Sequence, residues 1–259
     1  MQKKIRLAIV DSHPIQYHYQ YFRLLAARPE VDLEVFFCWD TRDGVQDPNY
    51  GQVKWDMPLL DGYRYRFLRN WSHRPGPGAR FFAQVNPGLF TLMRSDQFDV
   101  VWVWGYSTFS AWIAVFIANL RGLRVLFRGE AILDYPRSGW RKLIKEVVVR
   151  GFLKMVDGVA YSCAANRRYY EHYGVPSESL IFCPCAVHNQ FFQTHAQNLD
   201  KQTCKAELGL PLNRPVLLFV GSLMSIKRPL DMIKVVEAMS ASIRPILLIV
   251  GNGPLRASL

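Results

Sequence analysis

Two loops near the C-terminal end of the sequence place glycine directly after an apolar segment, where a phosphate group could be bound. The first starts at Gly221-Ser222 and reaches Lys227 six residues after the glycine. Glycine lets the backbone approach a ligand closely, and lysine can reach a phosphate as a mobile positive charge. The second loop contains Gly251 and Gly253, whose backbone N–H groups suit an anion. Lys227 alone is explained more simply by an exposed lysine at a helix start, so the signal comes from the two loops together.

A third candidate site follows the first predicted strand, in residues 11–18. It contains His13, Gln16 and His18 close to the start of a predicted helix, where an anion or a sugar hydroxyl could be held. Ligands of open α/β sheets bind beyond the carboxyl ends of the strands, so this loop is well placed. The local alternative is that Ser12 or Asp11 caps the helix and His13 packs against its neighbours. For His18 the local alternative is favoured.

These loops must be positioned by regular elements, and short apolar segments alternate with helical patterns along the chain. The predicted strands are Ile5–Val10, Leu33–Phe37, Tyr65–Leu68, Val100–Trp104, Val125–Phe127, Val159–Tyr161, Leu180–Phe182, Val216–Val220 and Ile246–Val250. The predicted helices are Tyr17–Ala27, Ser110–Leu120, Trp140–Met155, Ala164–Tyr173 and Leu230–Met239. Continuous apolar strands suit a parallel sheet covered on both faces. The alternation therefore predicts a doubly wound α/β fold.

The sequence predicts two domains joined by a linker. The first covers residues 1–190, the linker 191–212, and the second begins at residue 213. Residues 43–88 interrupt the first domain as a long excursion with one short strand and a mobile tip near Pro75–Gly78. The second domain has only about 47 residues and two predicted strands, too little for an independent core. We therefore expect the chain to be a fragment or a natural truncation of something longer.

The composition is that of a globular protein with an anionic partner. Of the 259 residues, 50% are hydrophobic, which excludes a disordered chain, a coiled coil and a collagen-like fibre. The formal net charge is +11, which points to phosphate-bearing small molecules, an acidic membrane face or nucleic acid. Charge alone does not choose among them.

The number of cysteines and the length of the longest apolar segment narrow the class of protein further. Five cysteines are an odd number for a disulfide framework, so we expect reduced thiols. Cys183-Pro184-Cys185 lacks the spacer of a zinc or redox pair, and no metal site is expected. The longest apolar stretch, Phe109–Leu120, is shorter than a membrane span. A soluble or peripheral protein is predicted.

The order of these segments resembles that of retaining glycosyltransferases with the GT-B fold, of the family 4 type. The family's Gly-Arg-Leu-x-x-x-Lys and Gly-x-Gly-Pro correspond to residues 221–227 and 251–254. Residues 13–18 and 128–130 are similar to a bacterial subgroup, and the resemblance covers essentially the whole chain. It implies two Rossmann-like doubly wound domains, the second incomplete here. The implied reaction transfers a sugar from a nucleotide diphosphate sugar to an acceptor hydroxyl with retention, with no cofactor besides that substrate.

The chain departs from the family pattern at several positions. Ser222 stands where the family has arginine, His188 where aspartate is common, and Trp104 or Gly105 where histidine is often found. The family's Glu-x7-Glu segment, which grips the donor, would follow Leu259. We therefore expect these 259 residues to transfer no sugar by themselves.

The resemblance and the predicted sheet together assign roles to individual residues. Donor-binding residues are Gly221, Ser222, Lys227, Gly251 and Gly253; acceptor-binding residues are Gln16 and Arg128; catalytic residues are His13 and Glu130. A lysine and backbone N–H groups can stabilise a leaving diphosphate without a metal, and the sequence has no Asp-x-Asp. The implied partners are a nucleotide sugar and a glycan or lipid-linked acceptor, in the cytoplasm. The alternative for Arg128 and Glu130 is a surface ion pair.

Two other functions stay open. A sugar-nucleotide epimerase of the same fold would need carboxylates in its cleft. A non-catalytic polyanion-binding module would use the +11 charge. Against that module, the sequence lacks interleaved basic and aromatic residues and zinc spacing, so nucleic acid is not expected as a partner.

One predicted helix combines basic and apolar residues in a way that suits an anionic membrane surface. Its basic residues, with one preceding it, are Arg137, Arg141, Lys142, Lys145 and Arg150, and its apolar residues include Trp140, Leu143, Ile144 and Val147. This pattern predicts peripheral binding at the inner membrane face. The alternative is an ordinary helix whose apolar side lies in the core.

Overall fold

The computed structural model describes residues 3–42, 44–47, 51–53, 57–76, 80–94, 96–133, 139–239 and 243–259. The chain forms two compact units. The first comprises Met1–Arg42 and Trp55–Val187, and the second comprises Asp43–Lys54 and His188–Leu259.

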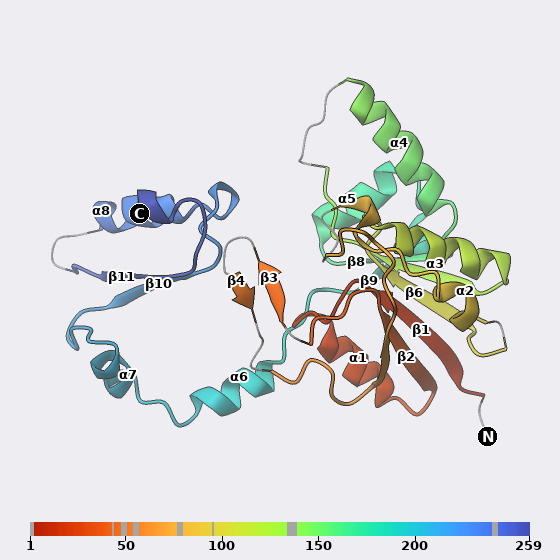
Figure 1. The fold of residues 1–259 in the computed structure, drawn as a ribbon. Coiled ribbons are helices and arrows are strands. Elements are labelled where there is room, and N and C mark those ends of the chain that lie inside the picture. The colour runs from red at the N-terminus through yellow and green to blue at the C-terminus, as the bar shows by residue number, and fades with distance from the viewer. Residues whose placement is uncertain are drawn as a thin grey trace. The chain divides into compact units, whose positions relative to one another are not determined.

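The first unit is built on a seven-stranded sheet with the order β5-β2-β1-β6-β7-β8-β9 (Figure 1). Its strands are β1 (Ile5–Asp11), β2 (Val31–Phe37), β5 (Arg64–Phe67), β6 (Val100–Trp104), β7 (Arg124–Arg128), β8 (Gly158–Tyr161) and β9 (Leu180–Phe182). Every neighbouring pair is parallel. This parallel arrangement confirms the predicted doubly wound α/β sheet. Its strands are continuous apolar segments because both faces of such a sheet are covered.

Helices cover both faces of this sheet. One face carries α3 (Phe109–Leu120), α4 (Trp140–Leu153) and α5 (Ala164–His172), and the other carries α1 (Tyr19–Ala26). The side chains of β6 alternate between two cores: Val101 and Val103 pack on the three-helix side. Trp102 and Trp104 pack on the α1 side with Phe22. This period of two lets one strand supply both cores.

The second unit contains a two-stranded parallel sheet, β10 (Val216–Val220) and β11 (Ile246–Val250). Its helices are α6 (Asn189–Ala196), α7 (Lys201–Glu207) and α8 (Pro229–Ala238), and a short antiparallel pair joins β3 (Val45–Asp47) to β4 (Gly51–Val53). The chain ends in a 3₁₀-helix, Arg256–Ser258. No described helix is both long and apolar enough to cross a bilayer.

Each strand and helix predicted from sequence is present, with ends within two residues of the prediction. The structure adds most at the predicted linker, residues 191–212, because most of α6 and all of α7 lie there. Both helices are capped by side chains: His188 Nδ1 accepts from the Phe191 amide at 3.0 Å, and Asp200 Oδ2 accepts from the Thr203 amide at 2.8 Å. The polar composition of these segments gives no apolar periodicity from which a helix could be predicted. An aspartate at a helix start can, in contrast, be recognised in a sequence.

The excursion at residues 43–88 is also richer than predicted. Besides β5 it contains β3 and β4, and a 3₁₀-helix at Phe81–Ala83 precedes α2 (Leu89–Leu92). The predicted mobile tip at Pro75–Gly78 falls partly outside the described residues. Asn86 anchors the returning chain, since its buried amide nitrogen donates to the carbonyl oxygens of Cys38 at 2.9 Å and Arg69 at 3.1 Å.

An ion pair stabilises the start of β1. Arg6 donates from its guanidinium and its amide to Asp99, with the closest contact 2.6 Å, and these bonds hold the pKa of Asp99 well below its usual range. A depressed carboxyl pKa stabilises the fold above about pH 4, and this contribution disappears as pH falls through the folded pKa. Asp99→Asn should therefore lower the melting temperature at pH 7, with the deficit shrinking below about pH 4. Asp96→Asn is the control, because its pair with Arg94 is more exposed. Equal losses in both variants across the pH range, measured by calorimetry, would contradict this.

Candidate functional site

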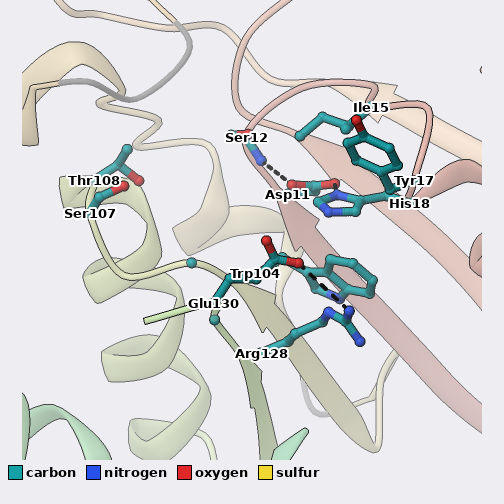
Figure 2. Close-up of a pocket in the computed structure, with 12 residues that line it drawn as sticks. Asp11, Ser12, Ile15, Tyr17, His18, Trp104, Ser107, Thr108, Arg128 and Glu130 are labelled. Atoms are coloured by element: carbon teal, nitrogen blue, oxygen red, sulfur yellow. Dashed lines mark hydrogen bonds and ion pairs between the residues drawn. The ribbon is translucent and has the colours of Figure 1, made fainter. Parts of the chain in front are cut away.

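A cavity of about 340 Å³ opens at the carboxyl ends of three adjacent strands of the first unit (Figure 2). The loop after β1 contributes Asp11, Ser12, Ile15, Tyr17 and His18; β6 and its loop contribute Trp104, Gly105, Ser107 and Thr108; β7 and its loop contribute Arg128, Gly129 and Glu130. From β1 the chain builds outward through β2 and β5, and then from β6 in the opposite direction to β9. The cavity therefore lies at the topological switch point, where open α/β sheets bind ligands.

A buried aspartate orients one histidine of the cavity. His18 Nδ1 lies 2.6 Å from Asp11 Oδ2, and the Asp11 side chain is only 2% exposed. The other carboxylate oxygen, Oδ1, accepts from the Ser12 amide at 2.7 Å. The His18 ring also packs against Trp104, with 4.1 Å between ring centroids. With Nδ1 engaged, Nε2 is the nitrogen that can meet a ligand, an arrangement suited to accepting a proton or hydrogen bond.

The sequence interpretation favours a local role for His18, and the structure gives it local partners in Asp11 and Trp104 while also placing it in the cavity lining. The N-terminal part of the same loop lies differently. His13 Nδ1 pairs with the Ser12 hydroxyl at 2.9 Å, its ring meets Trp39 edge-on, and burial lowers its pKa. Gln16 is half-buried. Neither His13 nor Gln16 lines the cavity.

Arg128 is built into the cavity lining rather than extended into solvent. Its side chain is 3% exposed, and Nη1 donates to the Cys183 carbonyl oxygen at 2.6 Å. The guanidinium also lies over the rings of Trp104 at 4.9 Å and Tyr21 at 5.4 Å. Much of its hydrogen-bonding capacity therefore holds the chain after β9. It brings a permanent positive charge beside the cavity.

Glu130 lies at the opening of the cavity. Its side chain is 62% exposed, and Oε1 lies 3.8 Å from Arg128 Nη2, the contact drawn in Figure 2. The same oxygen accepts from the Cys185 thiol at 3.3 Å. Burial, with Glu130 nearby, raises the pKa of Cys185. The ion pair between Arg128 and Glu130 that the sequence offered as an alternative is therefore present, but only Glu130 lies at the surface, because Arg128 is buried.

The start of α3 supplies the remaining polar groups. Ser107 and Thr108 lie on the opposite side of the cavity from Asp11 and His18 (Figure 2). Thr108 caps the helix by accepting from the Ala111 amide at 3.4 Å. The N-terminal end of a helix carries partial positive charge. Hydroxyls, a helix start, an oriented imidazole and a carboxylate together suit a polyhydroxylated ligand.

In the second unit the two glycine loops pack against each other. Gly221 N donates to Val250 O at 3.0 Å, and Leu223 N donates to Asn252 O at 2.9 Å. A Cβ on Gly251 would lie 1.9 Å from the carbonyl oxygen of Gly221, and one on Gly253 would lie 2.6 Å from that of Leu223. The close approach of these backbones therefore explains Gly251 and Gly253 without a ligand. The loops follow adjacent parallel strands, as a phosphate site would also require.

The other predicted donor-binding residues flank this contact. Ser222 is half-buried beside it, and Lys227 is exposed in the 3₁₀-helix Ser225–Lys227. The ammonium group of Lys227 has no ion-pair or hydrogen-bond partner among the described residues, whereas Arg228 pairs with Asp231 at 2.5 Å. Within the described ranges no three His, Cys, Asp or Glu side chains are grouped as metal ligands would be.

Sequence comparison identifies no relative, since neither a family model nor a curated protein matches the chain. Solved structures do match. HepE of Anabaena, in complex with UDP and glucose, superposes with a TM-score of 0.61 at 12% identity, over 98% of this chain and 63% of HepE. A putative UDP-N-acetylglucosamine 2-epimerase from Listeria monocytogenes gives 0.59 at 10% identity, over 96% of this chain and 63% of that one.

A third structure, UDP-N-acetylglucosamine 2-epimerase from Neisseria meningitidis bound to UDP-GlcNAc, gives 0.52 at 11% identity over 95% of this chain and 72% of the enzyme. The fold is GT-B-like. At identities this low the likeness establishes the fold alone. This chain spans about 63% of the length of HepE and of the Listeria protein.

Proposed function

We propose that this chain belongs to an enzyme that transfers a sugar from a nucleotide diphosphate sugar to an acceptor hydroxyl. The observation that carries the proposal is the Asp11–His18 pair in a cavity at the switch point of the first unit. In this assignment the acceptor occupies that cavity. Compared structures with UDP or a UDP-sugar bound share the fold, which supports a nucleotide-sugar substrate.

The proposed chemistry breaks the bond between the sugar and the diphosphate and forms a bond to the acceptor oxygen. His18 Nε2 takes the proton of the acceptor hydroxyl as that oxygen bonds to the anomeric carbon, and the diphosphate leaves with the electron pair of the broken bond. Glu130 orients a second hydroxyl from the opening of the cavity. Lys227 and the backbone N–H groups of the glycine loops stabilise the charge on the leaving diphosphate. The resemblance of those loops to the family favours retention at the anomeric carbon.

Epimerisation of a nucleotide sugar is the second candidate. Two of the three compared structures carry that activity in their names. The cavity also offers the groups that an epimerase needs to move protons, namely the carboxylate of Glu130 and the imidazole of His18.

Product analysis separates the two candidates. A chain carrying both domains in full is incubated with UDP-glucose or UDP-GlcNAc and a panel of acceptor sugars, and products are followed by proton NMR. Transfer gives a new glycoside whose anomeric coupling reports retention or inversion. An epimerase gives the epimer of the nucleotide sugar without an acceptor. Unchanged substrates in every mixture, from a folded protein that binds UDP, would overturn both candidates.

The donor assignment makes a separate prediction at Lys227. Lys227→Ala should weaken binding of a nucleoside diphosphate by about 1.5–3 kcal/mol, the usual range for a hydrogen bond to a charged group. Ser222→Arg, which restores the family residue, should strengthen it. Lys234→Ala is the matched control, because Lys234 is also exposed but lies on α8, away from the loops. Calorimetry showing the same affinity in all variants would reject this loop as the diphosphate site.

A further inference from the structure

Helix α4 has two apolar faces, one buried in the core and one largely exposed. The inner face packs Val149, Phe152 and Leu153 into the core, each under 10% exposed. The outer face carries Trp140, Leu143, Ile144 and Val147, which are 69%, 68%, 52% and 66% exposed. The alternative from sequence, an ordinary helix whose apolar side lies in the core, holds for the inner face, whereas these four residues lie outside the core.

These exposed residues form one continuous ridge. At 100° per residue, positions 140, 143, 144 and 147 fall within one arc, opposite Val149. The helix has 14 residues and is about 21 Å long. It lies on the outside of the three-helix layer (Figure 1), and its inner face is fixed because Phe152 packs on Trp112 of α3 with 4.8 Å between ring centroids. The helix that carries the ridge is therefore anchored to the core through its C-terminal half.

The charges beside the ridge are basic. Arg150 and Lys154 are exposed on its flank. The one acid in the α4 sequence, Glu146, is half-buried and held by Arg150 at 3.5 Å and His172 at 3.4 Å. The whole chain carries a net charge of +11. A partner for this surface must offer both an apolar layer and negative charge, a combination that an anionic lipid bilayer provides.

We propose that α4 docks the first unit on an anionic membrane surface. The ridge enters the boundary between headgroups and acyl chains, where tryptophan is favoured. The flanking cations remain at headgroup level, each strengthening partitioning by roughly fivefold. This inference rests on α4 alone and is independent of the proposed sugar transfer.

Vesicle co-sedimentation with the 259-residue chain tests the proposal. Vesicles of phosphatidylcholine are compared with vesicles containing about 30 mol% phosphatidylglycerol, at low salt and at about 0.5 M salt. We expect at least tenfold stronger binding to the anionic vesicles, weakened by salt. Leu143→Asp should reduce binding at least tenfold, and Lys154→Glu should reduce binding to the anionic vesicles alone.

The matched control is Leu24→Asp. Leu24 is 58% exposed on α1, which covers the opposite face of the sheet, so this variant should bind like the parent chain. Circular dichroism confirms that each variant is folded, as expected for substitutions at exposed positions. Equal binding to neutral and anionic vesicles, or equal losses in Leu143→Asp and Leu24→Asp, would overturn the proposal. Self-association that Leu143→Asp abolishes, without vesicle binding, would assign the ridge to a second copy instead.

Discussion

Replacing His18 by alanine should lower turnover by about 10²- to 10⁴-fold in an enzyme that carries both domains in full. This is the usual loss when a positioned acid–base group is removed. His18 is held at 2.6 Å through Nδ1 by a carboxylate that is almost completely buried, and the residue lines the cavity. Turnover is measured with saturating donor, and donor affinity is measured separately by calorimetry. Because His18 is assigned to the acceptor, donor affinity should change little.

His13→Ala is the informative comparison. The sequence assigns His13 to catalysis and predicts at least a tenfold loss, whereas the cavity is lined by His18. Asp11→Asn should cause part of the loss of turnover expected for His18→Ala. The neutral amide replaces the charged carboxylate that accepts the hydrogen bond from His18 Nδ1. Parent-like turnover in His18→Ala together with a large loss in His13→Ala would return the catalytic role to His13. Parent-like turnover in both variants would place the acceptor site elsewhere.

Gly251→Ala should destabilise the second unit by about 3 kcal/mol or more, because the new methyl group has no room. The added Cβ would lie 1.9 Å from the backbone oxygen of Gly221, and neither atom belongs to a flexible side chain. Relief requires the loops to separate, which breaks the bond from Gly221 N to Val250 O and that from Leu223 N to Asn252 O. Hydrogen exchange of the amides of β10 and β11 reports the loss directly.

Gly151→Ala provides the matched control. A Cβ at Gly151 meets no atom within 4 Å, and the residue lies within α4, where alanine is favoured over glycine. That variant should gain about 0.5–1 kcal/mol. If Gly251→Ala leaves the exchange of β10 and β11 as slow as in the parent chain, the two loops do not pack as described.

Several features of the site depended on contacts that no local pattern contains. From the sequence, Arg128 at the end of a strand is predicted to bind a ligand with its positive charge. In the structure its guanidinium donates a hydrogen bond to the carbonyl oxygen of Cys183, 55 residues further along the chain. His18 immediately precedes α1, which starts at Tyr19, and its ring lies against Asp11, seven residues earlier in the chain.

The sequence by itself determined the parallel sheet, the order of its elements and the loops at their carboxyl ends, because burial of continuous apolar strands is a local, periodic signal. It also located basic and apolar residues together on the helix at 140–155, but periodicity cannot say which apolar residues meet the core. Only the tertiary structure decided that Trp140, Leu143, Ile144 and Val147 face outward, and that Gly251 serves loop packing. The physical reason is the same in each case. Burial depends on what the rest of the chain brings alongside a residue, and that neighbour is set by long-range packing rather than by the residue's own surroundings in sequence.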